Sequence, residues 1–200
     1  MYPMKLKELN KIDKLYFGYE DIARTFDIGY SSAKVTASRY VRQGLVLRMK
    51  RNLYVRRDVW NAAGITEKFA LANLGQVPSY ISLTSALEYY EMTTQVLRDS
   101  FESVAIRRTK EIHLNGSVFR YAKIADELYF GFKKERGFFI ATPEKALVDA
   151  FYLMSYGRYS LDVPALESSK LDRGEIKRLS KAFPFRTRKM LKRYGYLETA

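Results

Sequence analysis

The stretch IGYSSAKVTASRYVRQGLVLRMKRNLYVRR, residues 28–57, constrains the fold most, because its apolar pattern changes once, at Gly44. Before Gly44, Ala33, Ala37 and Tyr40 recur with the spacing of one face of a helix. After Gly44, two β-prone runs flank the letters MKRN, which indicates a hairpin. A helix that ends at glycine and leads into a basic hairpin is typical of a winged helix-turn-helix.

Two further helices are predicted ahead of this stretch. Leucine and isoleucine at helical spacing indicate a helix over residues 4–15, and a second, short helix is expected over Tyr19–Phe26. Ser31 is a candidate N-cap for the third helix, and Gly44 fits its C-terminal cap. Three helices and a hairpin predict a winged helix-turn-helix domain over residues 1–60.

The outward face of the third helix is polar and basic. The first turns of a recognition helix go deepest into the major groove, where bulky side chains would hold the helix out. Serine is short and can donate and accept hydrogen bonds, whereas arginine reaches phosphate or guanine. The candidate DNA contacts of this helix are Ser31, Ser32, Lys34, Val35, Ser38, Arg39 and Arg42.

The hairpin is expected to act as the wing, which lies along the DNA backbone or in the minor groove. Such contacts add affinity and carry little sequence choice. Asn52 tolerates the left-handed backbone that the turn needs. The candidate wing contacts are Arg48, Lys50, Arg51 and Asn52.

Residues 61–200 predict a mixed α/β domain, so the fold class expected for the whole chain is α+β. The joint is placed at Arg56–Thr66, and helices are expected over Glu67–Leu74 and from Leu83 to Tyr90. Thr142 and Pro143 predict the start of a further helix, as N-cap and first helical residue. The stretches expected as strands are FESVAIRR, GSVFRYAKI, ELYFGFKK and GFFIA.

The net charge of +13 is unevenly distributed. Residues 1–60 hold 13 Lys and Arg against six Asp and Glu, residues 61–165 hold 12 against 12, and residues 166–200 hold ten against four. Two basic ends indicate a polyanionic partner, of which nucleic acid is the commonest.

The C-terminal excess falls on two predicted amphipathic helices that Pro184 separates. We expect this second basic patch either to add phosphate contacts beside the wing or to face an acidic or RNA-bound partner; a solvated basic face is the alternative. Its residues are Arg173, Lys177, Arg178, Lys181, Arg186, Arg188, Lys189, Lys192 and Arg193.

The sequence gives little support to an enzyme. There is no Cys, and the single histidine, His113, has no partner for a metal site. Lys145 and several carboxylates could be arranged as a nuclease site, but the letters TPEK are explained as a helix start, and Asp149 can pair locally. No catalytic residue, cofactor or metal is expected. The carboxylates in question are Glu102, Asp126, Glu127, Glu144 and Asp149.

A membrane protein is not expected either. No stretch approaches about 18 uncharged apolar residues, and the first residues lack the apolar core of a signal peptide. A cytoplasmic protein is therefore expected. The 16 Tyr and 12 Phe keep a pure interaction module open, with four tyrosines as candidate contacts: Tyr89, Tyr90, Tyr156 and Tyr159.

The stretches YISLTSALEYYEM and ATPEKALVDAFY resemble the two strongest signatures of the abortive-infection AbiEi antitoxin family. The stretch YEDIARTF and the residues that follow, up to YV of the hairpin, are similar to that family's winged helix. The resemblance covers nearly the whole chain in the same order. One departure is Asn52, where the family's wing usually carries glycine.

The resemblance implies a DNA-binding N-terminal domain and a larger C-terminal antitoxin domain. It implies that the protein represses its own operon by binding inverted repeats in the promoter, which requires two copies on the DNA. It also implies a type IV system that counters a co-encoded nucleotidyltransferase-class toxin, in which direct contact with the toxin is not required. The alternative is a stand-alone winged-helix regulator, or a protein- or RNA-interaction module without a toxin partner.

Overall fold

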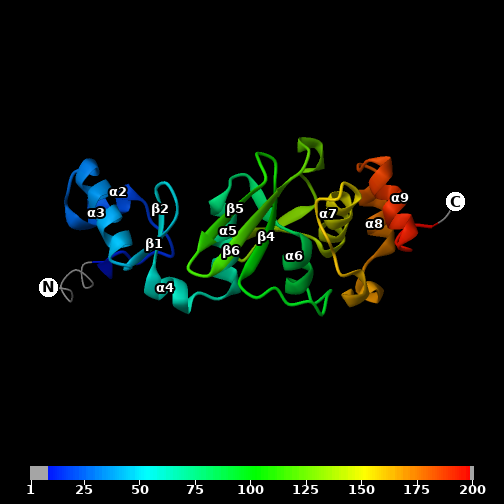
Figure 1. Cartoon of the computed structure of the whole chain (residues 1–200), viewed down its shortest axis with the longest axis horizontal. Coiled ribbons are helices and arrows are strands. Elements are labelled where there is room, and N and C mark those ends of the chain that lie inside the picture. The colour runs from blue at the N-terminus through cyan, green and yellow to red at the C-terminus, as the bar shows by residue number, and fades with distance from the viewer. Residues whose placement is uncertain (1–8, 199–200) are drawn as a thin grey trace.

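The structure of the protein, a computed structural model, describes residues 9–198 and has an α+β fold. Its parts follow one another along the long axis of the molecule (Figure 1). The helices α2 and α3 lie at one end, a six-stranded sheet occupies the middle, and α8 and α9 lie at the other end. Within the described residues, no helix is both long and apolar enough to cross a membrane.

The N-terminal unit, residues 9–56, consists of helices and a small antiparallel hairpin. Phe17 adds a bridge to this hairpin, because its amide and carbonyl both bond to Tyr54 at 3.0 Å. The elements are α2 (Tyr19–Phe26), α3 (Tyr30–Arg42), β1 (Val46–Lys50) and β2 (Leu53–Arg56).

The termini of α3 show where local sequence signals succeed and fail. The prediction of Ser31 as N-cap is wrong: α3 begins at Tyr30, and Gly29 in an extended conformation is its N-cap. Ser31 therefore lies in the first turn. The prediction for Gly44 is confirmed: its φ of +70° suits glycine, and its amide bonds to the carbonyl of Val41 at 2.9 Å.

The helix expected over residues 4–15 lies partly outside the described residues. Residues 10–15 are not helical, so this prediction is wrong there. Leu9 and Ile12 are nevertheless buried in the first core, and the turn between them is closed by a bond from the Ile12 amide to the Leu9 carbonyl at 3.1 Å.

The C-terminal unit, residues 57–198, is built on a mixed sheet with the order β5-β6-β4-β3-β8-β7. β3 pairs with β8 and β4 with β6 in parallel, and the other pairs are antiparallel. The strands are β3 (Ser79–Ile81), β4 (Ser100–Ala105), β5 (Lys110–Leu114), β6 (Ser117–Lys123), β7 (Phe132–Glu135) and β8 (Phe138–Ala141).

Helices cover this sheet and close its far end (Figure 1). Thr142 caps α7, because its hydroxyl accepts a hydrogen bond from the Lys145 amide at 3.2 Å, and Pro143 is the first helical residue. This helix start is therefore confirmed. The helices are α4 (Arg57–Ala62), α5 (Ile65–Gly75), α6 (Leu83–Tyr89), α7 (Pro143–Ser155), α8 (Arg173–Ser180) and α9 (Phe185–Arg193), with short 3₁₀ turns at Asp126–Leu128, Val163–Ala165 and Ser168–Lys170.

The β1–β2 hairpin belongs to two hydrophobic cores. Val46 and Tyr54 are buried with the α2–α3 pair, in one cluster. Leu47, Met49 and Val55 are buried in the other cluster, with the sheet and its helices. Successive side chains of a strand point to opposite faces, so one hairpin serves both. The boundary expected at residue 60 therefore does not separate the two cores.

Candidate nucleic-acid interface

The inward face of α3 is made of small residues. Ala33 and Ala37 are fully buried, and Tyr40 is nearly so. Small side chains at these positions let α3 pack closely on α2. Because the inward positions recur at the helical period, most of the remaining positions point to solvent, and Val41 packs at the edge of the core. The seven residues expected on the outward face are all exposed: Ser31, Ser32, Lys34, Val35, Ser38, Arg39 and Arg42.

The first turn of α3 also presents a tyrosine that the sequence prediction missed. Tyr30 is 44% exposed, and the ammonium of Lys34 lies 4.6 Å from the centre of its ring. Tyr19 supports the same ring edge-on, with ring centres 5.6 Å apart. A cation over an aromatic face restricts both side chains. The sequence pattern assigned Tyr30 to the loop before the helix. The contact between Tyr30 and Lys34, four residues apart on one helix, was therefore not predicted.

The four candidate wing residues form two pairs, which differ in whether the side chain bonds to another part of the protein. Arg48 and Arg51 are exposed, and within the described residues neither forms an ion pair. The ammonium of Lys50 donates a hydrogen bond to the carbonyl of Leu74 at 2.6 Å, in the C-terminal unit. Burial and nearby Arg107 lower the pKa of Lys50. This side chain therefore joins the two units, and its assignment to phosphate stays a prediction.

Asn52 has a structural role in the hairpin turn, and its DNA contact stays a prediction. Its φ of +57° confirms the left-handed turn, and both ends of its side-chain amide form hydrogen bonds inside the protein. The amide oxygen accepts a hydrogen bond from the Tyr19 backbone at 2.6 Å, and the amide nitrogen donates to Glu20 at 3.2 Å. Asn52 thus fixes the hairpin turn against α2 and leaves Arg48 and Arg51 as the wing's free cations.

The second basic patch lies at the other end of the molecule. Figure 1 shows α8 and α9 beyond the sheet, far from α3 and the hairpin. The expectation that the patch adds phosphate contacts beside the wing is therefore wrong. An acidic or RNA-bound partner stays a prediction. All nine side chains of the patch lie on α8, α9 or the turn between them: Arg173, Lys177, Arg178, Lys181, Arg186, Arg188, Lys189, Lys192 and Arg193.

The groups considered for catalysis are separated or enclosed. Within the described residues, no three His, Asp or Glu side chains are grouped to hold a metal ion, and His113 is exposed near Glu111. Lys145 and Asp149 form a fully buried ion pair in which the Lys145 ammonium also bonds to the Tyr80 hydroxyl at 2.8 Å. Burial raises the pKa of Asp149 and lowers the pKa of Lys145.

Of the four tyrosines considered as partner contacts, three bond inside the protein. The hydroxyls of Tyr89 and Tyr90 donate to Glu135 at 2.7 and 3.2 Å. Tyr159 donates to buried Glu102 at 2.7 Å. The fourth, Tyr156, is 44% exposed and lies under the guanidinium of Arg186.

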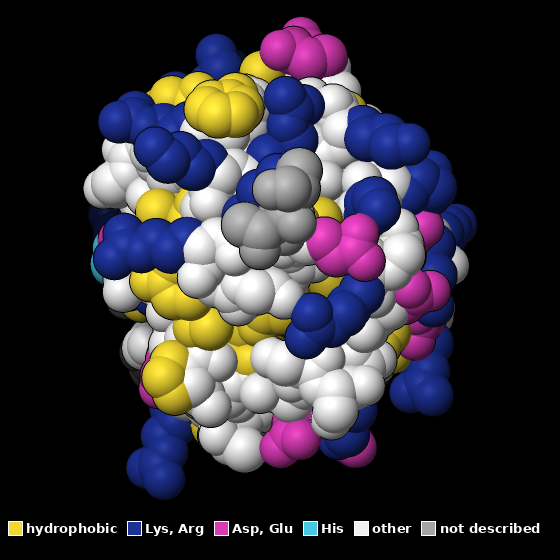
Figure 2. All heavy atoms as spheres, turned by 90° about the vertical axis from the view of Figure 1, so that its right-hand side faces the viewer, with side chains coloured by type: hydrophobic (Ala, Val, Ile, Leu, Met, Phe, Trp, Pro, Cys, Tyr) yellow, Lys and Arg dark blue, Asp and Glu magenta, His cyan; other side chains and the backbone are white. Residues whose placement is uncertain are grey.

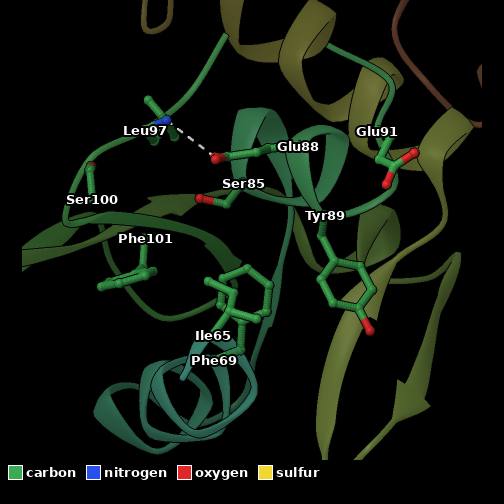
Figure 3. A pocket seen from close by; sticks show the side chains of 9 residues that line it. All are labelled: Ile65, Phe69, Ser85, Glu88, Tyr89, Glu91, Leu97, Ser100 and Phe101. Carbon is green, nitrogen blue, oxygen red and sulfur yellow. Dashed lines mark hydrogen bonds between the residues drawn. The ribbon is translucent and has the colours of Figure 1, made fainter. Parts of the chain in front are cut away.

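A hollow of about 370 Å³ lies between α5, α6 and β4 (Figure 3). Its floor is apolar, with Phe69 and Phe101. The Glu88 carboxylate points to the loop and accepts a hydrogen bond from the Leu97 amide at 3.2 Å, whereas Tyr89 points away toward Glu135. The rim carboxylate holds the protein's own loop, so this hollow shows no chemistry that would select nucleic acid.

Comparison with known proteins bears on the fold alone. No protein-family model matches the chain, and no curated protein matches it. Among solved structures, the chain is similar to the crystal structure of the RV2827C protein from Mycobacterium tuberculosis, with a TM-score of 0.59 and 11% sequence identity. The match covers 96% of this chain and 76% of that chain. At this identity the likeness shows a shared α+β fold.

Proposed function

We propose that this protein is a sequence-specific DNA-binding transcriptional regulator, in which α2, α3 and the β1–β2 hairpin form a winged helix-turn-helix. One observation carries the proposal: the exposed face of α3 combines short hydroxyl side chains in its first turn with arginines further along. This combination suits a helix that lies in the major groove.

Each part of α3 has a distinct task in this proposal. Ser31 and Ser32 allow the N-terminal turn to approach base edges, and Val35, which is 56% exposed, offers an apolar contact to a thymine methyl group. Arg39 and Arg42 follow on later turns and reach guanine or phosphate. The inward alanines keep the helix close to α2, so the outward face stays in a fixed orientation.

The hairpin serves as the wing with Arg48 and Arg51 as phosphate contacts. Because Val46 and Tyr54 are buried in one cluster with Ala33 and Ala37, the wing is held at a fixed position relative to α3. Phosphate contacts from such a rigid element set the register of the protein on the duplex.

The resemblance to AbiEi antitoxins supports a narrower role. We propose a cytoplasmic regulator that represses its own operon through inverted repeats, with two copies on the DNA, and a C-terminal unit that counters a nucleotidyltransferase-class toxin. Co-expression with the neighbouring gene tests the second half: the protein should restore growth that the neighbouring product arrests. A neighbouring product that is harmless alone, or whose arrest persists, contradicts the antitoxin role and favours a stand-alone regulator.

DNA binding is tested by fluorescence anisotropy with the native upstream duplex and a scrambled duplex, at about 50 and about 200 mM salt, because nonspecific binding falls steeply over this range. We expect the native duplex to bind about a hundredfold tighter or more at the higher salt. The double variant Arg39→Gln, Arg42→Gln should lose this preference. Equal binding of both duplexes by the native protein would overturn the proposal.

A further inference from the structure

A basic cleft is lined by residues of α8, of α9 and of the segment that follows α9. These helices lie at the end of the molecule opposite α3 (Figure 1). The volume of the cleft, about 330 Å³, falls in the range of ligand pockets. The residues that line it and bear on the argument are Lys177, Ser180, Lys181, Arg188, Lys192 and Glu198.

Much of the positive charge at this end is not neutralised by the protein. Three cations of α8 are engaged: Arg178 pairs with Glu175, Lys177 with Glu198, and Arg173 donates to a carbonyl. Among the described residues, the others form no ion pair. These six are Lys181, Arg186, Arg188, Lys189, Lys192 and Arg193. Figure 2 shows this end directly, with Lys and Arg side chains spread over it.

Arg188 is fixed in position inside the cleft. One guanidinium nitrogen, Nη1, donates to the carbonyls of Lys181 and Phe183 at 3.3 and 3.2 Å, across the turn between α8 and α9. The guanidinium has five N–H donors, so the remaining ones can bind a phosphate with little further loss of side-chain freedom.

An exposed aromatic ring adjoins this charge. Phe185, at the start of α9, is 71% exposed, the largest exposed fraction among the large hydrophobic side chains of the described residues. It shares a helix face with Arg188, Lys189 and Lys192, which follow three, four and seven residues later. Hydrophobic side chains also show among the basic ones in Figure 2. Aromatic rings beside a basic groove are the combination that binds unpaired bases, because every base offers a face for stacking.

We propose that the α8–α9 end binds single-stranded RNA, as a second site separate from the DNA interface. A duplex keeps its base faces stacked and would leave Phe185 without a partner. An acidic protein surface would satisfy the cations but would not need the ring. The carboxylate of Glu198 at the cleft would repel phosphate, yet it can accept a hydrogen bond from a ribose 2′-hydroxyl, which DNA lacks.

The test uses the full chain and a labelled mixed-sequence RNA of about 12 nucleotides, within the range of single-strand sites. Lys181, Lys189 and Lys192 are exposed lysines, and their ammonium groups make no hydrogen bond within the described residues, so replacing all three with Gln should preserve the fold. We expect this triple variant to bind RNA about tenfold more weakly or worse. The dependence of log Kd on log salt should fall by about 2, at roughly 0.7 for each lost phosphate contact.

Two further variants separate charge from stacking. Phe185→Ala should weaken RNA binding about fivefold or more without changing the salt dependence. A control with the same loss of charge at exposed positions elsewhere, Arg107→Gln, Lys123→Gln and Lys134→Gln, should bind RNA nearly as the native protein does. The α3 variant Arg39→Gln, Arg42→Gln should keep full RNA affinity, which distinguishes this site from the DNA interface.

Three results would overturn the proposal. The first is a triple lysine variant that binds RNA no more weakly than the charge-matched control. The second is equal affinity for single-stranded DNA of the same sequence. The third is displacement of the RNA by polyglutamate as effectively as by unlabelled RNA, which would assign the surface to an acidic protein partner.

Discussion

The side-chain oxygen of Asn52 lies 2.6 Å from the backbone nitrogen of Tyr19, and this hydrogen bond joins the turn of the hairpin to the start of α2. The first amides of a helix have no partner within the helix itself. Tyr19 carries such an amide, and a residue 33 positions away in the chain satisfies it. The hairpin turn and the first turn of α2 are therefore held together by one side chain.

Replacing Asn52 with glycine should remove this bond and keep the left-handed turn. We expect the free energy of unfolding to fall by about 1 kcal/mol, as for the loss of a helix cap. Asn52→Ala should cost about 1 kcal/mol more, because an added penalty applies to a Cβ at positive φ. Urea unfolding measures both. A glycine variant as stable as the native protein would show that the bond contributes nothing.

The roles of α3 and the wing are separated by Arg39→Ala and Arg51→Ala. If Arg39 contacts a base edge, its loss should weaken operator binding by about 1–3 kcal/mol and leave scrambled DNA much less affected. Arg51→Ala should weaken both duplexes alike and lower the salt dependence by about 0.9. Arg51 is chosen over Lys50 because the Lys50 ammonium is bonded to Leu74. Equal effects of the two changes on both duplexes would refute this division.

Local signals predicted much of the fold. The period of Ala33, Ala37 and Tyr40 gave the inward face of α3, and Thr142 with Pro143 gave the start of α7, because helix faces and caps depend on residues close in the chain. β5 was missed as a strand. It is a short edge strand in which Ile112 and Leu114 alternate with the exposed Glu111 and His113, so the strand pattern was present in the sequence and was overlooked.

Long-range partners could not be predicted in this way. The sequence shows Lys50 and Asn52 as polar turn residues, and only the fold brings Leu74 and Tyr19 to them. The two basic ends of the sequence looked alike, because charge counts do not show where the ends lie in space. The fold places them at opposite ends of the long axis (Figure 1), which is why the second patch needs a partner of its own.

The shared hairpin predicts that the two units unfold together. Met49 is buried in the C-terminal core, where Trp60, the single tryptophan, packs against Phe119 with ring centres 5.9 Å apart. Met49→Ala should lower stability by about 2–5 kcal/mol. The midpoints of urea unfolding, followed by Trp60 fluorescence and by far-UV circular dichroism, should both shift to lower urea by the same amount.

Val46→Ala is the matched control, because Val46 lies next to Leu47 on β1 but is buried in the other core. We expect this variant also to lower the urea midpoint that Trp60 fluorescence reports, although Val46 belongs to the core of α2 and α3. A Val46 variant whose circular dichroism shifts while its Trp60 transition stays in place would show that the two units unfold independently.

Glu135 predicts a specific loss of stability in acid. Hydrogen bonds from Tyr89 and then Lys133 lower the pKa of this carboxyl. Because the folded-state pKa lies below the unfolded value, the contribution to stability is present above the unfolded pKa, about 4.3. It is lost as pH falls through the folded value. The unfolding free energy of the Glu135→Gln variant should therefore decrease less steeply than that of the native protein as the pH falls below about 5. A slope identical to that of the native protein would exclude this contribution.

The ion pair of Lys145 and Asp149 predicts strong coupling between its members. The stem of Lys145 passes Gly131, where a Cβ would meet the Lys145 Cγ at 2.9 Å. Its ammonium lies 5.2 Å from the ring centres of Phe130 and Phe183. Lys145→Met leaves a buried carboxylate that accepts hydrogen bonds from hydroxyls but has no cation beside it, which should cost about 3–5 kcal/mol.

The double variant Lys145→Met, Asp149→Asn tests this coupling in a double-mutant cycle. Asparagine carries no charge, and its oxygen can still accept hydrogen bonds from Tyr80 and Ser82, which the native carboxylate accepts at 2.9 Å each. We therefore expect the double variant to be more stable than Lys145→Met alone, with an interaction energy of about 1–3 kcal/mol. Simple additivity would mean that Lys145 and Asp149 contribute independently to stability, without the strong coupling expected of a buried ion pair. Operator binding at temperatures where the double variant stays folded should not change, because the pair is enclosed in the C-terminal core, away from α3.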